Sequence, residues 1–338
     1  MKLIYTLFFI LLFLVSCSSK TSREPDAEVV HQESSDTLGF VAERNEEPKK
    51  EISIRTELLY DKYTLEDIYP YKDTTRIFQL DKIKKGLAFL DSIQSKPAKW
   101  GILQNYKNKN GEAPLVKEYK RNEYKRIADL MGVERYQSVA LYPVTDSLTA
   151  ERYGRDGALV KIINDLDSSS NFMKIETLDF DGDWLIQKRY IKKIEDTVVF
   201  KKAIFVDVMN QNIITFEKDG SEWLIRSKNP ATTGLHNPPH MQETPTGLFV
   251  IQERKNKMYF LVDGTTRTGG FAPYASRFTN GGYIHGVPVN TPRTQLIEYS
   301  KSLGTTPRSH MCVRNATSHA KFVYDWVIPE QTVVFVID

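Results

Sequence analysis

Residues 200–216, FKKAIFVDVMNQNIITF, predict a β-hairpin. β-branched and aromatic residues dominate Phe200–Val208 and Ile213–Phe216, and the segment Asn210–Asn212 between them has the composition of a tight turn. Turn signals recur about every 8–12 residues from here to residue 338, which predicts a mostly antiparallel, all-β domain over 199–338, a sandwich or a barrel. Further strands are predicted at Trp223–Ile225, Gly247–Gln252, Met258–Val262 and Val333–Ile337, the middle two as a pair, and a helix at Ser318–Trp326.

Upstream of this domain, two regions differ in pattern. Residues 53–136 are predicted to be mostly helical, because after a possible cap at Asp73–Thr75 apolar residues recur at helical spacing. Residues 137–198 contain short apolar runs separated by turns, and the turn Asp181–Asp183 precedes Trp184, which resembles a small bacterial SH3-like barrel. Such a module could bind a ligand or brace its neighbour. The predicted fold class is therefore multidomain α+β. The apolar residues at helical spacing are Ile77, Leu80, Ile83, Leu87, Leu90 and Ile93.

The N-terminus predicts export and a lipid anchor. The apolar run Leu3–Val15 is shorter than the roughly 20 residues that span a bilayer, but it suits a secretory signal. Leu14–Cys17, of sequence LVSC, resembles a bacterial lipobox, which implies that residues 1–16 are removed and that Cys17 is lipidated. Residues 17–52 are then a polar tether. We expect a protein of the cell envelope, anchored to the outer or inner membrane and facing the periplasm.

The charge balance and the cysteine count of the chain restrict the classes of function that it can have. The chain has 46 basic and 43 acidic residues, a formal net charge of +3, which argues against nucleic acid as a partner. It has two cysteines, so lipidation of Cys17 would leave Cys312 as the one thiol, without an intramolecular disulfide partner. A free thiol in an oxidising compartment is either reactive or buried and inert.

The neighbours of Cys312 favour reactivity. The segment Ser309–Arg314, SHMCVR, places the thiol two residues after His310, and Tyr283–Gly286, YIHG, supplies His285 further upstream. A histidine base or a nearby positive charge activates a thiol, and backbone N–H groups can receive a developing oxyanion. The pattern predicts a Cys/His acyl-transfer site, and by itself it leaves open which histidine is the base.

These motifs together resemble the YkuD-type L,D-transpeptidases. The family has an Ile-His-Gly element, then a loop, then Ser/Thr-His-Gly-Cys, often with an arginine. Glu243–Phe249, ETPTGLF, is similar to the family's Thr-Pro-x-Gly-x-Phe segment, and Arg277-Phe278 also fits. The resemblance covers roughly 200–338.

The resemblance implies an activity and roles for individual residues. Cys312 would form a thioester with a peptidoglycan tetrapeptide stem and release D-Ala, and the acyl group would pass to an amine, giving a 3–3 crosslink, or to water. His285 would be the base, and Gly286 would orient it through its carbonyl. His310 would shape the oxyanion site or support the thiolate, and Ser309 would be a further catalytic residue. Arg314, Tyr283 and Thr244 are expected to bind substrate. No metal or organic cofactor is implied, and the oligomeric state is left open.

Two departures from the family pattern matter. The family glycine before the cysteine is Met311, which is tolerable only if its φ is negative; otherwise the oxyanion site is distorted. The loop is also long, since Cys312 follows His285 by 27 positions, and residues 290–306 are expected to form a rim or lid. Met311 and the upstream regions keep an alternative open: a peptidoglycan-binding lipoprotein on a weakly active or inactive transpeptidase scaffold.

Overall fold

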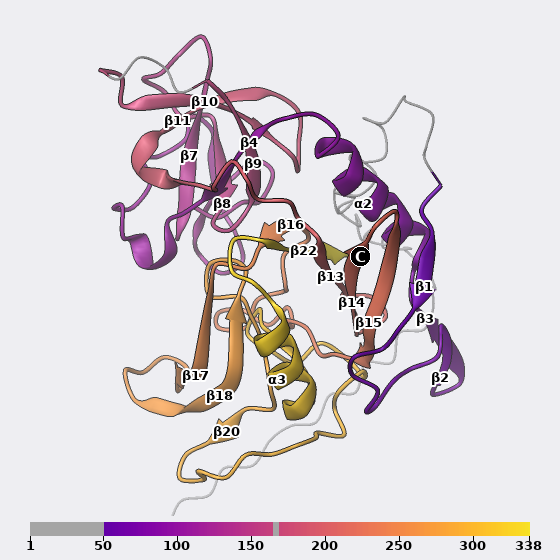
Figure 1. Ribbon diagram of the computed structural model, residues 1–338. Coiled ribbons are helices and arrows are strands. Elements are labelled where there is room, and N and C mark those ends of the chain that lie inside the picture. Colours follow the sequence, from indigo (N-terminus) through magenta and orange to yellow (C-terminus); the bar gives the residue numbers. More distant parts are fainter. Residues whose placement is uncertain (1–50, 165–168) are drawn as a thin grey trace, which may run out of the picture. The chain divides into compact units, whose positions relative to one another are not determined.

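The computed structural model describes residues 51–164 and 169–338 (Figure 1). The predicted signal peptide, Cys17 and almost all of the tether lie outside the described residues. In the part of the chain that is described, no helix has the length and apolar character needed to cross a membrane.

The predicted hairpin at residues 200–216 is confirmed and forms the centre of a six-stranded sheet. Strand β13 (Lys202–Asp207) pairs antiparallel with β14 (Asn212–Asp219), and Asp207 faces Asn212 at the turn. Two pairs in this sheet are parallel, β13 with β22 and β1 with β15, so the sheet is only mostly antiparallel. The strand order is β1 (Ile54–Thr56), β15 (Glu222–Pro230), β14, β13, β22 (Thr332–Ile337) and β16 (Gly247–Val250).

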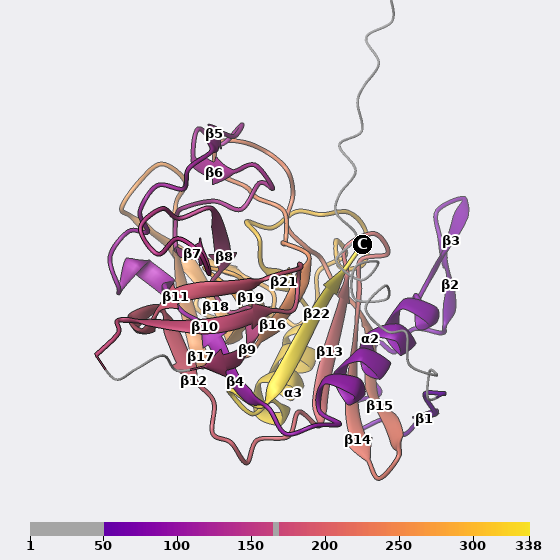
Figure 2. The ribbon, with the colours of Figure 1, turned by 90° about the horizontal axis from the view of Figure 1, so that it is seen from above.

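This sheet is buried on both faces, which explains why its central strands are almost continuously apolar. Successive residues point to opposite faces, so Phe205 and Phe335 stack at 4.6 Å beneath helix α2 (Leu80–Ile93), whereas Ile204 and Val334 join the opposite core. Figure 2 shows α2 beside β13–β15. Residues 54–93 thus pack on the same sheet as the C-terminal strands.

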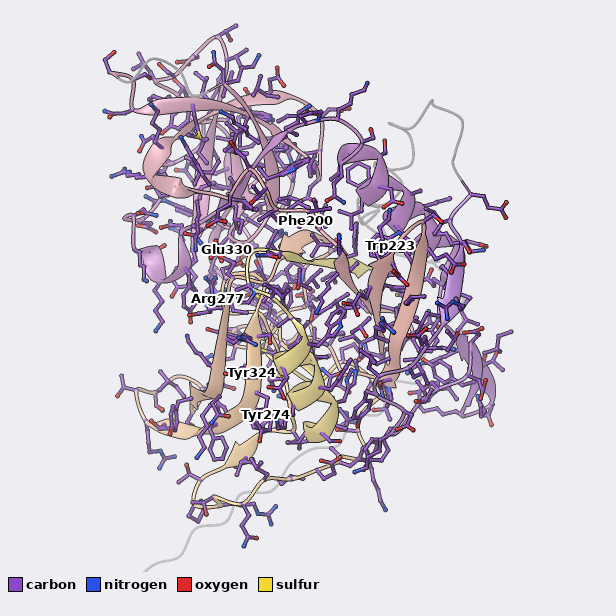
Figure 3. All side chains as sticks on the ribbon, in the orientation of Figure 1. Phe200, Trp223, Tyr274, Arg277, Tyr324 and Glu330 are labelled. Atoms are coloured by element: carbon purple, nitrogen blue, oxygen red, sulfur yellow. The ribbon has the colours of Figure 1, made fainter. Side chains whose placement is uncertain are left out.

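A second sheet and one helix cover the other face. This sheet has the order β17 (Glu253–Leu261), β18 (Thr268–Arg277), β19 (Tyr283–His285) and β21 (Val313–Arg314), with β20 (Val289–Asn290) also on β18. Helix α3 (Thr317–Trp326) is confirmed within one residue of its prediction. Tyr324 of α3 contacts Tyr274 of β18 at 5.9 Å between ring centres (Figure 3).

One predicted pairing is wrong. The segments at 247–252 and 258–262 become β16 and β17, but β16 pairs with β22 and β17 pairs with β18. The partner of β16 is distant in sequence, and the partner of β17 follows a hairpin turn that the apolar pattern does not indicate. Both segments are therefore strands, as predicted, but they do not pair with each other.

The mostly helical region predicted for 53–136 is also wrong. In this range, which is fully described, α2 is the α-helix and the other regular elements are a 3-10 turn (Tyr106–Asn108) and short strands. The proposed cap at Asp73–Thr75 instead forms the turn and start of a hairpin, because Tyr71 pairs with Thr74. The strands are β1, β2 (Ile68–Tyr71), β3 (Thr74–Ile77), β4 (Lys99–Leu103), β5 (Tyr119–Arg121) and β6 (Ile127–Asp129).

Residues 137–198 are rich in strands, but an SH3-like barrel is not supported. They contribute to a seven-stranded sheet, here called the accessory sheet, which includes β4 from outside the predicted range. Its own core contains Leu103, Val139, Val160, Ile175 and Trp184. The strand order is β12 (Ile191–Lys193), β4, β9 (Leu159–Asn164), β10 (Phe172–Thr177), β11 (Asp183–Gln187), β7 (Ser138–Pro143) and β8 (Arg152–Arg155).

Candidate active site

Two short parallel strands bring the Cys and His motifs together. Ile284 of β19 faces Val313 of β21, and His285 faces Arg314. Ile284 and Val313 are fully buried in the core between the sheets. Because side chains alternate along a strand, Cys312 and Arg314 lie on the same face as His285, opposite that core.

The residues on this face line one cavity of about 670 Å³. Cys312, His285 and Arg314 line it together with Ser309 and His310, so five of the eight predicted catalytic and substrate-binding residues meet there. Part of the long loop at 290–306 also lines it, as expected for a rim: Asn290, Ser300, Ser302 and Leu303.

His285 is held in one tautomer as a neutral base. Its Nδ1–H donates to the carbonyl oxygen of Gly286 at 2.6 Å, which leaves Nε2 as an acceptor. Burial, with a smaller contribution from the charge of Arg314, lowers the pKa of His285 to about 4. Among residues 51–164 and 169–338, no hydrogen-bond partner engages Nε2. The imidazole is therefore uncharged at neutral pH and free to accept a proton.

Cys312 is a buried, protonated thiol in this state. Its Sγ lies 3.5 Å from the carbonyl oxygen of Gly281, to which the S–H donates. Burial raises the pKa of Cys312, while a hydrogen bond from the backbone of Tyr283 and the charge of Arg314 act in the opposite direction. The pair is thus a neutral thiol and a neutral imidazole, and a sulfur acting as a nucleophile here would have to lose its proton as it attacks.

The loop before the thiol is fixed at two carbonyl groups. The Ser309 hydroxyl donates to the carbonyl of Cys312, and the Thr244 hydroxyl donates to the carbonyl of Met311 at 2.8 Å. Thr244 also accepts from the N–H of Gly234, which lies beside Ser309 in a short parallel bridge. Thr244 therefore lies behind the loop rather than in the cavity, where a substrate-binding residue was expected.

Met311 has a positive φ of +86°. This is the conformation that we took to be unfavourable for a methionine, because a Cβ is strained there and glycine is not. Its side chain is 8% exposed, so packing around it holds the strained backbone in place.

Arg314 lines the cavity as a cation without a carboxylate partner among the described residues, since the cavity's Asp263 pairs with His310. Burial lowers its pKa, and its Nε is buried without a hydrogen-bond partner. Within the described residues its guanidinium makes no ion pair. An anionic group that enters the cavity would pair with the guanidinium of Arg314. His310, by contrast, is exposed and bonds through Nε2 to Asp263, 2.9 Å away in the turn between β17 and β18.

Tyr283 forms the buried wall behind the thiol. It is 1% exposed, does not line the cavity, and its hydroxyl donates to that of Tyr106 at 3.0 Å and accepts from Lys255. Tyr283 packs with Cys312, Ala275 and Met258. The Tyr283 hydroxyl thus contacts Tyr106, which follows β4, and Lys255 of β17, whereas a substrate contact was expected for it.

The turn that carries Gly281 is anchored to the accessory sheet by Asp156. The Thr279 hydroxyl donates to the carbonyl of Asp156 at 2.6 Å, and the Asp156 carboxylate pairs with Arg277 at 2.6 Å. Arg277, at the end of β18, is labelled in Figure 3. Gly157 has φ +89°, and a Cβ there would lie 1.8 Å from the carbonyl oxygen of Phe278. This approach requires glycine.

Sequence reasoning did not find these supporting residues. Asn280–Gly282 is a turn signal beside the YIHG motif and could have indicated Gly281. Asp156 and Tyr106 carry no local signal, because their partners lie 121 and 177 positions away.

Comparison with known proteins identifies part of the chain. Residues 201–336 match the model of the YkuD family, described as the L,D-transpeptidase catalytic domain. No curated protein matches the chain. Arg277, His285 and the SHMCVR motif all lie within the matched range.

Solved structures are similar at low identity. An L,D-transpeptidase from Mycobacterium smegmatis is 14% identical, with 54% of this chain and 93% of that chain covered, at a TM-score of 0.33. One from Mycobacterium tuberculosis H37Rv is 16% identical, with 55% and 92% covered, at 0.32. A fused Zn-dependent amidase/peptidase/peptidoglycan-binding domain-containing protein from Clostridium acetobutylicum ATCC 824 is 20% identical, at a TM-score of 0.30. The similarity covers 41% of this chain and 52%, about half, of that chain. The family match is therefore the finding that bears on function.

Proposed function

We propose, from the premise that residues 201–336 are an L,D-transpeptidase catalytic domain of the YkuD family, that this chain transfers peptidoglycan stem peptides through Cys312. The observation that carries the proposal is the shared cavity of Cys312, His285 and Arg314, with His285 neutral and its Nε2 free. A thiol, a neutral base and an unpaired cation are what acyl transfer from a peptide carboxyl donor requires.

The first half-reaction breaks the bond between the third stem residue and the terminal D-Ala. As Sγ attacks the carbonyl carbon, the thiol proton passes from its contact with Gly281 to Nε2 of His285. The tetrahedral intermediate then collapses, His285 returns the proton to the leaving nitrogen, and D-Ala departs as an amine. The product is a thioester on Cys312.

The second half-reaction regenerates the thiol. An amine of another stem attacks the thioester, His285 removes a proton from that amine and returns one to the sulfur, and a 3–3 crosslink forms. Water in place of the amine gives L,D-carboxypeptidase activity. Arg314 would hold a carboxylate of the donor, because its guanidinium is the unpaired charge on the cavity wall.

Release of D-Ala from a purified disaccharide-tetrapeptide tests this proposal. Wild-type protein should release D-Ala, and Cys312→Ala and His285→Gln should reduce the rate by at least about 100-fold, as expected for loss of a nucleophile or a base. His240→Gln, which changes an exposed histidine outside the cavity, is the matched control and should retain full activity. Unchanged D-Ala release by Cys312→Ala would refute the proposal.

Met311 favours a second candidate function, a peptidoglycan-binding protein whose transpeptidase site is weak or inactive. Its φ of +86° places strain directly before the nucleophile. A carbapenem such as meropenem distinguishes the two, since it acylates a competent thiol. A mass increase located on Cys312 supports the enzyme, whereas an unmodified protein that still sediments with cell-wall sacculi supports the binding protein.

We propose separately that the chain is a lipoprotein of the cell envelope, held by Cys17 and facing the periplasm. The apolar run and the LVSC motif support this. Cells grown with an alkyne analogue of palmitate should label the wild-type chain and Cys312→Ala but not Cys17→Ala. Label that persists in Cys17→Ala would contradict the anchor without affecting the transpeptidase proposal.

A further inference from the structure

A second cavity, of about 320 Å³, lies between the accessory sheet and the segment that leads into β16. It shares no lining residue with the Cys312 cavity. Strands β4, β8, β9 and β10 form much of its wall, and Thr246, directly before β16, closes it on the side of the catalytic domain. A neighbouring cavity of about 340 Å³ shares Met131 and Arg152 with it, so the two adjoin and together could hold several residues of a peptide.

Two guanidinium groups line this second cavity. Arg152 stacks over the ring of Phe180 at 3.7 Å, and its Nε is buried without a hydrogen-bond partner. Arg155 is desolvated enough that burial lowers its pKa. Within residues 51–164 and 169–338, neither side chain forms an ion pair or a hydrogen bond. Both side chains are half-buried, and a partly desolvated guanidinium without a hydrogen-bond partner favours binding of an anion.

Three carboxylates act on the charge of Arg155: Asp179, which lines the same cavity, and Asp129 and Glu134, which are engaged elsewhere. Asp129 accepts three backbone N–H groups, from Met131, Val133 and Tyr153. Glu134 pairs with Arg126 at 2.9 Å. These bonds leave both arginines available to a ligand.

Asp179 also lines the cavity and, unlike the two arginines, supplies a hydrogen-bond acceptor. One of its oxygens accepts the N–H of Leu248 at 3.0 Å, and burial raises its pKa to about 6. Its second oxygen could accept an N–H from a bound peptide. The remaining walls are apolar, with Leu103, Tyr153, Leu159 and Phe180 among them, and would suit a small aliphatic side chain.

We propose that this cavity is a non-catalytic binding site for a peptide with a free carboxylate, held by Arg152 and Arg155. The carboxylate pairs with the guanidinium groups that line the cavity, a peptide N–H donates to Asp179, and an aliphatic side chain contacts the apolar wall. The identification of that peptide as a peptidoglycan stem rests on the proposed function. The site would let the accessory sheet hold one stem while Cys312 processes another.

Arginine footprinting tests this in the full chain carrying Cys312→Ala, which binds without turnover. Phenylglyoxal modifies accessible arginines, and tryptic mass spectrometry reports each one. The disaccharide-tetrapeptide should slow modification of Arg152 and Arg155 by about tenfold, the effect of a charge-assisted hydrogen bond. The same peptide with its carboxylates amidated should not, and exposed Arg121 should react equally in all samples.

Calorimetry gives the second measurement. The Cys312→Ala chain should bind the tetrapeptide at two sites; Arg152→Met with Arg155→Met should remove one event, and Arg314→Met the other. Equal phenylglyoxal modification with and without peptide would overturn the site even if the arginine variants fail to fold. Protection of Arg152 and Arg155 in the Cys312→Ala chain, together with no D-Ala release by the wild-type chain, would leave the site standing and refute the proposed function.

Discussion

The carbonyl oxygen of Gly281 lies 3.5 Å from the sulfur of Cys312. The turn that carries Gly281 is fixed by Asp156, which lies outside the range 201–336 that matches the family, since Thr279 donates to the backbone of Asp156 and Arg277 pairs with its carboxylate. The accessory sheet is thus connected to the thiol of Cys312 through one turn. Removing the buried ion pair should affect both the stability of the fold and the position of the thiol.

Asp156→Asn should therefore destabilise the protein by about 2 kcal/mol, because it removes one of the two carboxylates that pair with the buried Arg277 and leaves Glu253 as the other. Urea denaturation measures this loss, and the rate of Cys312 acylation by meropenem should fall in parallel. Asp325→Asn is the matched control: its ion pair with Lys321 is more than half exposed, and its loss should cost no more than about 0.5 kcal/mol. Equal losses in the two variants would contradict a special role for Asp156.

Contacts between residues that are close in sequence can be predicted from the sequence pattern, whereas contacts between distant residues cannot. The hairpin at Lys202–Asp219 is local, and alternation with a turn signal predicts it. Cys312 and His285 are distant in sequence, and the family resemblance, rather than periodicity, associates them. Asp156 could not be predicted, because a lone aspartate in a turn gives no indication of a partner at residue 277.

The errors upstream have a similar physical origin. Residues 77–93 do have helical spacing, and most of that segment is a helix, but extending the helical prediction over 53–136 ignored non-local strand pairing. Strand β4 forms because Trp100 and Ile102 pair with residues of β9 some 60 positions later. Intrinsic strand preference is weak and depends on such partners. The same recruitment of β4 explains why an isolated SH3-like barrel does not form.

Met311→Gly should increase activity. Glycine adopts φ of +86° without strain, so the loop that presents Cys312 would no longer depend on packing around Met311. Met311→Ala is the control, because it removes the same side chain but keeps a Cβ. We expect Met311→Gly to be more stable than Met311→Ala by about 1 kcal/mol in urea denaturation and to be acylated faster by meropenem. If the alanine variant is as stable and as fast, backbone strain is not the property that distinguishes this loop.

The protonation state of Cys312 predicts the pH dependence of its alkylation. Iodoacetamide reacts with the thiolate, and burial raises the pKa of Cys312 above its ordinary value of 9.0. The alkylation rate of the free enzyme should therefore still be rising at pH 9. A plateau at pH 6–7 would instead indicate a preformed thiolate–imidazolium pair and contradict a neutral His285. Intact mass with Cys312→Ala as a blank assigns the reaction to this thiol.

Two buried histidines predict acid sensitivity. Burial lowers the pKa of His285 to about 4 and that of His319 to about 3, whereas both are about 6.5 in the unfolded chain. His319 is fully buried, and its Nε2 contacts the Ser227 hydroxyl at 2.9 Å. Between pH 6.5 and 4 the unfolded state binds more protons than the folded state. Stability is therefore complete above pH 6.5 and is lost as the pH falls toward 4.

The loss should reach about 1.4 kcal/mol per pH unit for each histidine. Urea denaturation between pH 6.5 and 5 measures it in an Asp179→Asn background, because burial raises the pKa of Asp179 to about 6 and its protonation in the folded state would oppose the slope. His319→Gln lowers stability at every pH, but it should also remove about half of the slope, because one of the two buried imidazoles is gone. His240→Gln changes an exposed histidine and should leave the slope intact. An unchanged slope in His319→Gln would mean that this imidazole is already protonated in the folded protein, which its complete burial opposes.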